Sequence, residues 1–477
     1  MTLNLQIEDF ARLYAVIWLV EIGLTSRWLR IFFGSEVNGG YRDDFKVRML
    51  NGGWFQQVVI AIWGTIHIFI LVSEFWQGFL AAALFLNHHH FVRERWRSLL
   101  RGMGAPGFML YWMSAAVLLL SVGEDVGGVV QSAIEALVVV DFASIMITAG
   151  FYKLKSGYRR GFGIEFGLVN PQWCYFHNLF RKLRSSSIVF RSLNELSWSL
   201  EVAGGILLFF PTTRLFGVAV ISLGFIFLLP LIRLGVLCLT VISCCLVVGS
   251  TNESSSALFS SPFESQLTKF ERSVALLVCI YFIGMLTTRF IQMRNVFSHK
   301  SLPRIIQRFS EIFGNLFGII LWRVFTPDVT GFAVEIEIRD SSCANVASSK
   351  NTELPSMWGR GRFAHVAEAI AVTSLFTLRR YLPNAHNLFE NRLIRHAKSL
   401  ADPEVSAVTY RYLEVVKVNT RFCLLETARF DVMVISRLIL QVVMPTSNLE
   451  RAIGPSPVRP GVRLGSYEQR QTSREQM

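Results

Sequence analysis

Ionisable side chains interrupt one long apolar stretch of the chain, residues 132–157. Glu135 and Asp141 fall inside this stretch, and Lys153 falls where it ends. Each charge held at the centre of a bilayer costs about 2.5–3.5 kcal/mol even on a lenient insertion scale. We therefore expect neighbouring helices to surround this stretch and to supply partners for its charges. A lysine kept dry in such a bundle loses its proton more readily and can serve as a general base.

The partner of Lys153 has to come from another helix. At 1.5 Å per residue, the two carboxylates of its own stretch lie about 27 Å and about 18 Å away along the helix axis. Glu201 belongs to the next apolar span and has Ser197 and Gly205 on the same helical face. Gly204 and Gly205 allow two backbones to approach closely there. The spacing thus predicts that Glu201 is the charge partner of Lys153.

Simpler roles are open for these residues. Lys153 is followed by Lys155, and a lysine in the last turn of a membrane helix is usually an anchor that reaches the headgroups. Glu201 can instead bond a backbone or hydroxyl group inside the bundle. His67 stands in an apolar helix and is more typical of a packed histidine than of a metal ligand. His88–His90 point in different directions and precede several arginines, so we expect a solvated loop and no metal site.

The composition is typical of a polytopic membrane protein with an appended soluble part. Hydrophobic residues make up 52% of the 477 and charged residues only 17%, which favours several apolar spans. The net charge is +13, and the Lys and Arg residues cluster in loops beside these spans. That pattern favours a lipid bilayer as partner, and no basic stripe typical of nucleic-acid binding is present. The seven cysteines have no C-x-x-C spacing, so neither a disulfide framework nor a zinc site is expected.

We expect about nine membrane helices. Counted with the basic residues at the span ends, from Arg27 and from Lys155 onward, the loops after the first and fifth spans hold five and seven Lys or Arg. The loop after the third span holds four, and the second and fourth loops hold none. By the positive-inside rule the N-terminus is then outside and the C-terminal region is cytoplasmic. The protein would be a multi-pass protein of the plasma membrane if its source is bacterial. The expected spans are 10–33, 54–72, 75–87, 108–122, 132–157, 194–210, 213–229, 231–249 and 273–290.

The chain changes character after the last span. Residues 303–325 alternate charged and apolar positions at helical spacing, which is typical of a helix lying in the membrane interface. Residues 331–340 alternate with a period of two and predict a strand. Amphipathic helices at 363–382 and 387–400 precede β-rich segments that end at Pro445. The predicted fold is an all-α polytopic membrane bundle over 1–330, a smaller α+β soluble region over 331–445 and a disordered tail over 446–477.

Two stretches carry a resemblance to a known family. They are ITAGFYKLKSGYRRG at 147–161 and ELSWSLEVAGGILLFFPTTRLFGV at 195–218. Together with LWRVFTPDVTGFAVEIEI further on, they make the chain resemble the HTTM family (horizontally transferred transmembrane domain). This family includes the membrane domain of vitamin K-dependent gamma-carboxylases. The resemblance covers roughly 10–330 and is best in 145–220.

The resemblance implies a membrane enzyme that modifies a peptide, protein or lipophilic substrate. The carboxylases carry a lysine in an Ala-Gly-x-x-Lys-Leu segment as the base that activates a reduced quinone, and Lys153 matches it. Glu201 and Arg214 match two further family positions, so the resemblance implies a catalytic pair with Lys153 as the base and Glu201 as the acid that orients it. Phe225 stands near the place where the carboxylases have a histidine, and their propeptide-binding and glutamate-binding parts are not recognisable. A non-enzymatic accessory or transport protein is the alternative.

Overall fold

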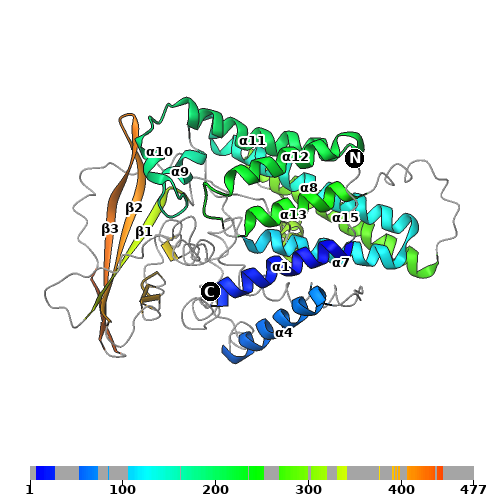
Figure 1. The fold of residues 1–477 in the computed structure, drawn as a ribbon, viewed down its shortest axis with the longest axis horizontal. Coiled ribbons are helices and arrows are strands. Elements are labelled where there is room, and N and C mark those ends of the chain that lie inside the picture. Colours follow the sequence, from blue (N-terminus) through cyan, green and yellow to red (C-terminus); the bar gives the residue numbers. More distant parts are fainter. Residues whose placement is uncertain are drawn as a thin grey trace.

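The protein is mostly helical, with a C-terminal four-stranded sheet beside the helices (Figure 1). The helices are α1 (Ile7–Ser26), α4 (Gly53–Val72), α7 (Pro106–Val126), α8 (Gly128–Ser156), η2 (Tyr158–Arg160), α9 (Ile164–Val169), α10 (His177–Lys182), α11 (Ile188–Leu208), α12 (Pro211–Leu228), α13 (Leu237–Ser250), α15 (Lys269–Phe297) and α16 (Arg304–Phe317). The computed structural model describes residues 7–26, 53–72, 84, 106–161, 163–234, 236–251, 268–298, 302–317, 319, 330–340, parts of 375–397, 405–435 and 438–443.

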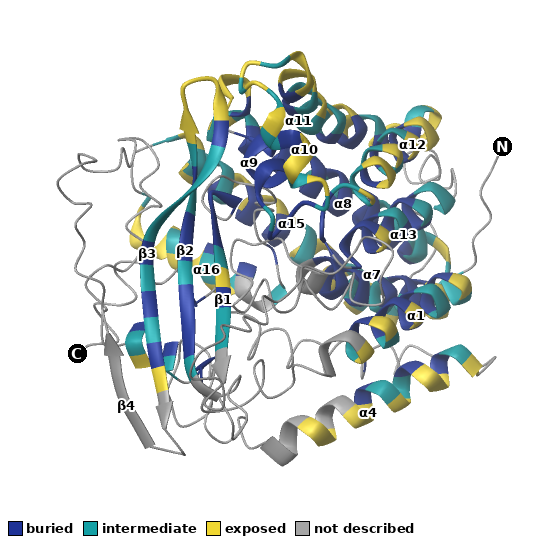
Figure 2. Ribbon diagram, turned by 60° about the vertical axis from the view of Figure 1, so that its left-hand side comes forward, coloured by how far each residue is buried: buried dark blue, intermediate teal, exposed yellow. Residues whose placement is uncertain are grey.

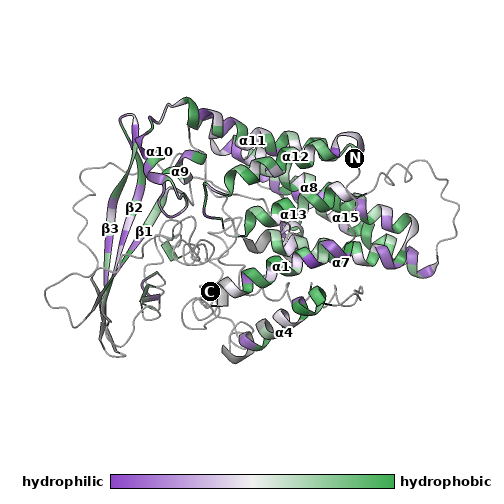
Figure 3. Cartoon of the chain, viewed as in Figure 1, coloured by the Kyte–Doolittle hydropathy of each residue, from purple (hydrophilic) through white to green (hydrophobic). Residues whose placement is uncertain are grey.

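Four of the described helices are long and apolar enough to cross a membrane. Two further apolar helices, Ala61–Val72 and Leu237–Ser250, are shorter. The outer surface of the long helices is apolar as well, as lipid contact requires. On α12 and α15 many large apolar side chains are exposed, and Figures 2 and 3 show these helices as exposed and hydrophobic. The four candidate spans are Met109–Val126, Gly128–Arg160, Pro211–Leu228 and Lys269–Phe297.

Only some of the nine expected spans therefore correspond to candidate membrane helices among the described residues. Helices α1 and α11 stand where spans were expected, but they are not among the four candidate spans. Helix α13 begins at Leu237, later than the expected start of the span 231–249. Its 14 residues cover about 21 Å, which is less than the ~30 Å hydrocarbon core. The expected span 75–87 lies largely outside the described residues.

Helix α8 is the centre of the bundle, because it contacts α7, α11, α13 and α15. Its closest neighbour is α11, and two glycines make this approach possible. A Cβ atom on Gly150 would lie 2.7 Å from the carbonyl oxygen of Trp198, and one on Gly205 would lie 2.7 Å from a side-chain carbon of Ile147. Of the two glycines predicted to allow a close helix contact, Gly205 does so against α8, whereas Gly204 faces Ile221 of α12.

The sheet has the order β1-β2-β3-β4, and all neighbouring strands are antiparallel. The strand predicted at 331–340 is confirmed, and the β-rich segments before Pro445 form the other three strands. The residues described within the two expected amphipathic helices are helical, and the expected disordered tail lies outside the described residues. The strands are β1 (Phe332–Asp340), β2 (Val405–Val418), β3 (Arg421–Ile435) and β4 (Leu438–Val443).

The turn between β2 and β3 fastens the sheet to the helices. Asn419 adopts a left-handed conformation in this two-residue turn (φ 54°), as such hairpins require. The amide of Ser185 donates to the carbonyl oxygen of Thr420 at 2.7 Å. Next to the turn, the ring of Phe422 packs edge-on against Phe166 of α9 and Phe190 of α11. The sheet therefore meets the bundle at the end where α8 stops and α11 begins (Figure 1).

Candidate functional site

The two residues predicted to form a catalytic pair lie in contact between α8 and α11. The Lys153 amine donates to Oε1 of Glu201 at 2.5 Å and to the hydroxyl oxygen of Ser197 at 3.1 Å. Only 4% of the Lys153 side chain and 9% of the Glu201 side chain are exposed. An ion pair so well buried is expensive in a low-dielectric interior and has to be stabilised by its geometry.

The local structure explains why Lys153 turns inward. Helix α8 ends at Gly157, which has φ 104° and caps the helix in a left-handed conformation. Lys155 is exposed and occupies the anchor position, whereas Lys153 lies on the α11 side and is buried. Its amine also lies 5.9 Å from the ring centroid of Tyr158, which closes the site below the helix end. The anchor role considered for Lys153 is therefore wrong in this structure.

Glu201 presents an unused hydrogen-bond acceptor. Its Oε2 atom is buried and has no hydrogen-bond partner among the described residues, although Oε1 binds Lys153. A buried carboxylate oxygen without a donor costs free energy, and such atoms are rare in folded proteins. The arrangement leaves one acceptor beside a cationic amine, which is what a donor group of a substrate would need.

A second polar contact, between Asn194 and Glu165, lies on the same face of α11 and nearer to the sheet. Asn194, Ser197 and Glu201 recur at helical spacing, so they lie on one side of the helix. The Asn194 amide donates to Oε2 of Glu165 at 2.7 Å, and its oxygen accepts from the Ile164 amide at 2.9 Å. Burial raises the pKa of Glu165, and hydrogen bonds from the backbone and from Asn194 offset this only in part. Sequence reasoning missed Glu165 and Asn194, although the spacing from Asn194 to Glu201 was visible.

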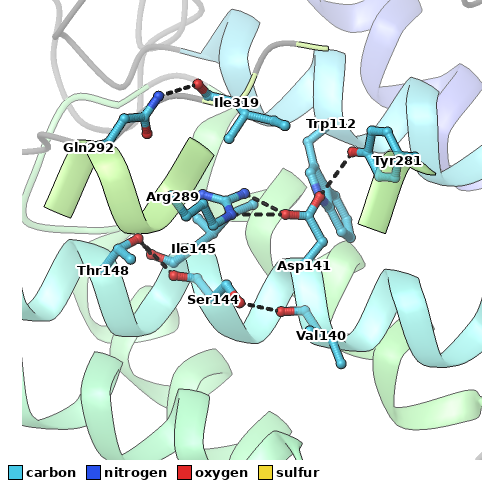
Figure 4. Close-up of polar contacts among 10 residues, drawn as sticks. All are labelled: Trp112, Val140, Asp141, Ser144, Ile145, Thr148, Tyr281, Arg289, Gln292 and Ile319. Carbon is cyan, nitrogen blue, oxygen red and sulfur yellow. Dashed lines mark hydrogen bonds and ion pairs between the residues drawn. The ribbon is translucent and has the colours of Figure 1, made fainter. Parts of the chain in front are cut away.

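Asp141 belongs to a separate cluster where α8 meets α7 and α15 (Figure 4). Arg289 of α15 donates to Oδ1 of Asp141 through Nε, at 3.1 Å, and through Nη2. The indole of Trp112 on α7 donates to Oδ2 at 2.9 Å, and Tyr281 approaches the same oxygen at 3.5 Å. Both oxygens of Asp141 are thus bonded, so the cluster joins α7, α8 and α15 as a structural ion pair.

The other residues singled out from the sequence do not reach Lys153. Glu135 is half-buried and accepts from Gln131 on its own helix. Arg214, which matched a family position, donates to the carbonyl of Leu208 and to Thr251 instead.

The histidines do not form a described metal site. His67 is fully buried among Tyr14, Trp18 and Trp63 and bonds the Trp63 carbonyl, as expected of a packed histidine. His88–His90 lie outside the described residues. Within the described ranges, no group of three or more His, Cys, Asp or Glu could hold a metal ion.

Comparison with known proteins gives no relative: no family model, curated protein or solved structure matches the chain. The resemblance to the HTTM family is therefore carried by the quoted residues alone.

Proposed function

We propose that the protein is an integral membrane enzyme of the HTTM type, with Lys153 and Glu201 as its acid–base pair. The substrate would be a peptide, a protein or a lipophilic molecule reached from within the bundle. The observation that carries this proposal is the buried Lys153–Glu201 contact, in which one carboxylate oxygen has no partner among the described residues. Ionisable groups inside membrane bundles are rare and usually serve function.

The chemistry follows from the short contact. Moving one proton from the Lys153 amine to Glu201 turns an ion pair into a neutral amine and a neutral acid. A dry interior favours the neutral pair, because burying charge is costly. The neutral amine can then take a proton from a substrate, while Ser197 holds it in place and Glu201 stores or returns the proton.

A reduced quinone, the cofactor implied by the family resemblance, fits the donor and acceptor set. Its hydroxyl could donate to the unpartnered Oε2 of Glu201, and the amine of Lys153 is adjacent. Such a group would supply reducing equivalents for oxygen chemistry. Phe225, in the place of the family histidine, is a buried apolar side chain and contributes no proton to the site.

The test compares the wild-type protein with Lys153→Ala, Lys153→Arg and Glu201→Gln in lipid nanodiscs. The assay follows labelled carbon dioxide entering a glutamate-containing peptide in the presence of reduced vitamin K and oxygen. We expect Lys153→Ala to abolish incorporation while the protein still elutes as a folded particle. Lys155→Ala is the matched control, because this exposed lysine lies two positions on and should be dispensable. Full activity in both Lys153 variants would refute the proposal, as would a wild-type protein inactive with several quinones and peptides.

A non-enzymatic accessory or transport role is the second candidate. It is favoured by the Asp141–Arg289 pair, which shows that this bundle uses an ion pair to join helices. In that case Lys153 and Glu201 would join α8 to α11 or pass protons. Proton uptake by liposomes containing the protein, measured with an internal pH dye, distinguishes the two. A flux lost in Glu201→Gln, without any peptide modification by the wild type, would favour transport.

A further inference from the structure

A buried arginine without a counter-charge lies in the connection between α12 and α13. Only 3% of Arg233 is exposed, yet its Nε and Nη1 atoms have no hydrogen-bond partner among the described residues. The groups that act on it electrostatically are Tyr175 and Cys174. Both are uncharged at pH 7, because burial raises the pKa of Cys174 to about 12 and Tyr175 is a phenol. An arginine stays charged at this pH, so the buried cation lacks an anion from the described chain.

The geometry keeps the donors of Arg233 available. Its guanidinium carbon lies 4.6 Å from the ring centroid of Tyr175. Guanidinium groups stack on aromatic faces, and their N–H bonds then point outward in the guanidinium plane. An oxyanion approaching in this plane can therefore accept a charge-assisted hydrogen bond from Nε or from Nη1.

Backbone pairing places a second unpartnered donor on the same face. Residues 173–175 pair antiparallel with 231–233, through the Cys174–Ile232 bridge and the bond from the Arg233 amide to the Trp173 carbonyl at 2.7 Å. Opposite and alternate residues of such a pair share a face. Trp173 is 6% exposed, and its indole Nε1 is buried without a partner among the described residues.

A third nitrogen and further positive charge lie nearby. Nδ1 of His177 is also buried, and no described side chain bonds it. Burial lowers the pKa of His177, and the charges of Arg181 and Arg233 lower it further, whereas a hydrogen bond with the backbone of Cys174 raises it. His177 and Arg181 thus add polar and positive groups to the surroundings of Arg233, and no carboxylate is among the electrostatic neighbours of Arg233.

We propose that Arg233, Trp173 and His177 form a binding site for a phosphate-class oxyanion. The guanidinium provides the charge and the unpartnered Nε and Nη1 donors, and the indole and imidazole contribute from the side. A tetrahedral phosphate uses donors from several directions better than a planar carboxylate does. The oxyanion can come from a phospholipid headgroup or from a free phosphate compound, and the experiment separates these two sources. The site is independent of Lys153 and Glu201.

The experiment uses the full chain, purified in an uncharged detergent and stripped of lipid, with the melting temperature as readout. Without added anion, we expect Arg233→Gln to melt at or above the wild-type temperature, because the variant removes an uncompensated buried cation. Saturating inorganic phosphate, or added phosphatidylglycerol, should then raise the wild-type melting temperature by about 2 °C or more and leave the variant unchanged. With the anion present, the wild type would then be more stable than Arg233→Gln.

Controls separate anion binding at Arg233 from a general effect of salt or of lipid. Arg160→Gln removes an exposed arginine and should respond to the anion as the wild type does. Chloride at equal ionic strength, and a galactolipid without phosphate, should have no effect. A response to phosphate alone indicates a soluble ligand, and a response to phosphatidylglycerol alone indicates a lipid.

A conservative variant keeps the test decisive if Arg233→Gln fails to fold. Arg233→Lys retains the charge but loses the fork and the stacking, so the half-saturating anion concentration should rise roughly tenfold or more. The proposal is overturned if neither phosphate nor phosphatidylglycerol stabilises the wild type beyond its control. It is also overturned if the Arg233 variant that folds gains as much as the wild type.

Discussion

Breaking the Asp141–Arg289 pair should be among the most destabilising single changes in the bundle. The two side chains are 5% and 6% exposed, and Trp112 donates to the second carboxylate oxygen. Asp141→Asn keeps the size and an acceptor for Trp112 but leaves Arg289 as an uncompensated buried charge. Removing one partner of a buried pair typically costs about 3–5 kcal/mol. The double variant, Asp141→Leu with Arg289→Met, removes both charges and should lie within about 1 kcal/mol of the wild type or above it.

The measurement is unfolding in mixed micelles of a mild detergent and dodecyl sulfate, extrapolated linearly to zero denaturant. The exposed pair of Arg159 and Glu195 is the matched control, with side chains 61% and 42% exposed at 3.4 Å. Arg159→Ala should cost less than about 1 kcal/mol, as exposed pairs do. A cost of Asp141→Asn no larger than that of this control would contradict the expected penalty of an uncompensated buried charge. A double variant as unstable as the two single changes added together would contradict it as well.

Two further predictions concern the sheet. Phe422→Ala should cost about 3–5 kcal/mol, because this ring is 4% exposed between Phe166 and Phe190. The same change at the exposed Phe176 should cost little, and equal melting temperatures for the two variants would contradict the docking of the sheet. The pKa of His396 is lowered from 6.5 to about 4 by burial, so the unfolded chain binds a proton more readily than the native one. Stability should fall as the pH drops from 6.5 through 4, by about 3 kcal/mol in all, and His396→Leu should remove this slope in pH-dependent melting. An unchanged slope would exclude His396 as its cause.

The Lys153–Glu201 contact could be predicted from the sequence, but the Asp141–Arg289 contact could not. Lys153 had no acid within reach on its own helix, and the next span offered Glu201 with Ser197 and glycines on one face. Helical spacing therefore made Glu201 the best candidate for the charge partner of Lys153. Asp141 finds its partner 148 residues away. Arg289 stands near the end of an apolar span and has the pattern of a headgroup anchor. No local pattern states which helix packs against which, so only the packing of α15 on α8 reveals this pair.

The length of α13 was missed for a related reason. Hydropathy predicts one continuous span over 231–249, but Ile232 and Arg233 leave the helix to pair with the loop before α10. Backbone pairing between distant segments depends on tertiary contacts, which an apolar run in the sequence does not reveal. The same pairing forms the surroundings of Arg233. Arg233 therefore lies outside the helix that hydropathy predicts and belongs to the proposed anion site.

The position of the sheet constrains how a peptide could reach Lys153. Phe422 packs against α9 and α11 at the end of the bundle where α8 stops, and Lys153 lies in the last turn of α8. Asn194 lies between this contact and Ser197 along α11, and it donates a hydrogen bond to Glu165 of α9. A chain held by the sheet would therefore arrive at the end of the bundle that contains the amine, whichever side of the membrane the sheet occupies. The exposed Lys155 and the two arginines of η2 belong to the same end, and the positive-inside rule predicts that it faces the cytoplasm. Protease protection of a tag placed after β4, in sealed vesicles, tests that side directly, and a tag found outside would place Lys153 near the outer surface as well.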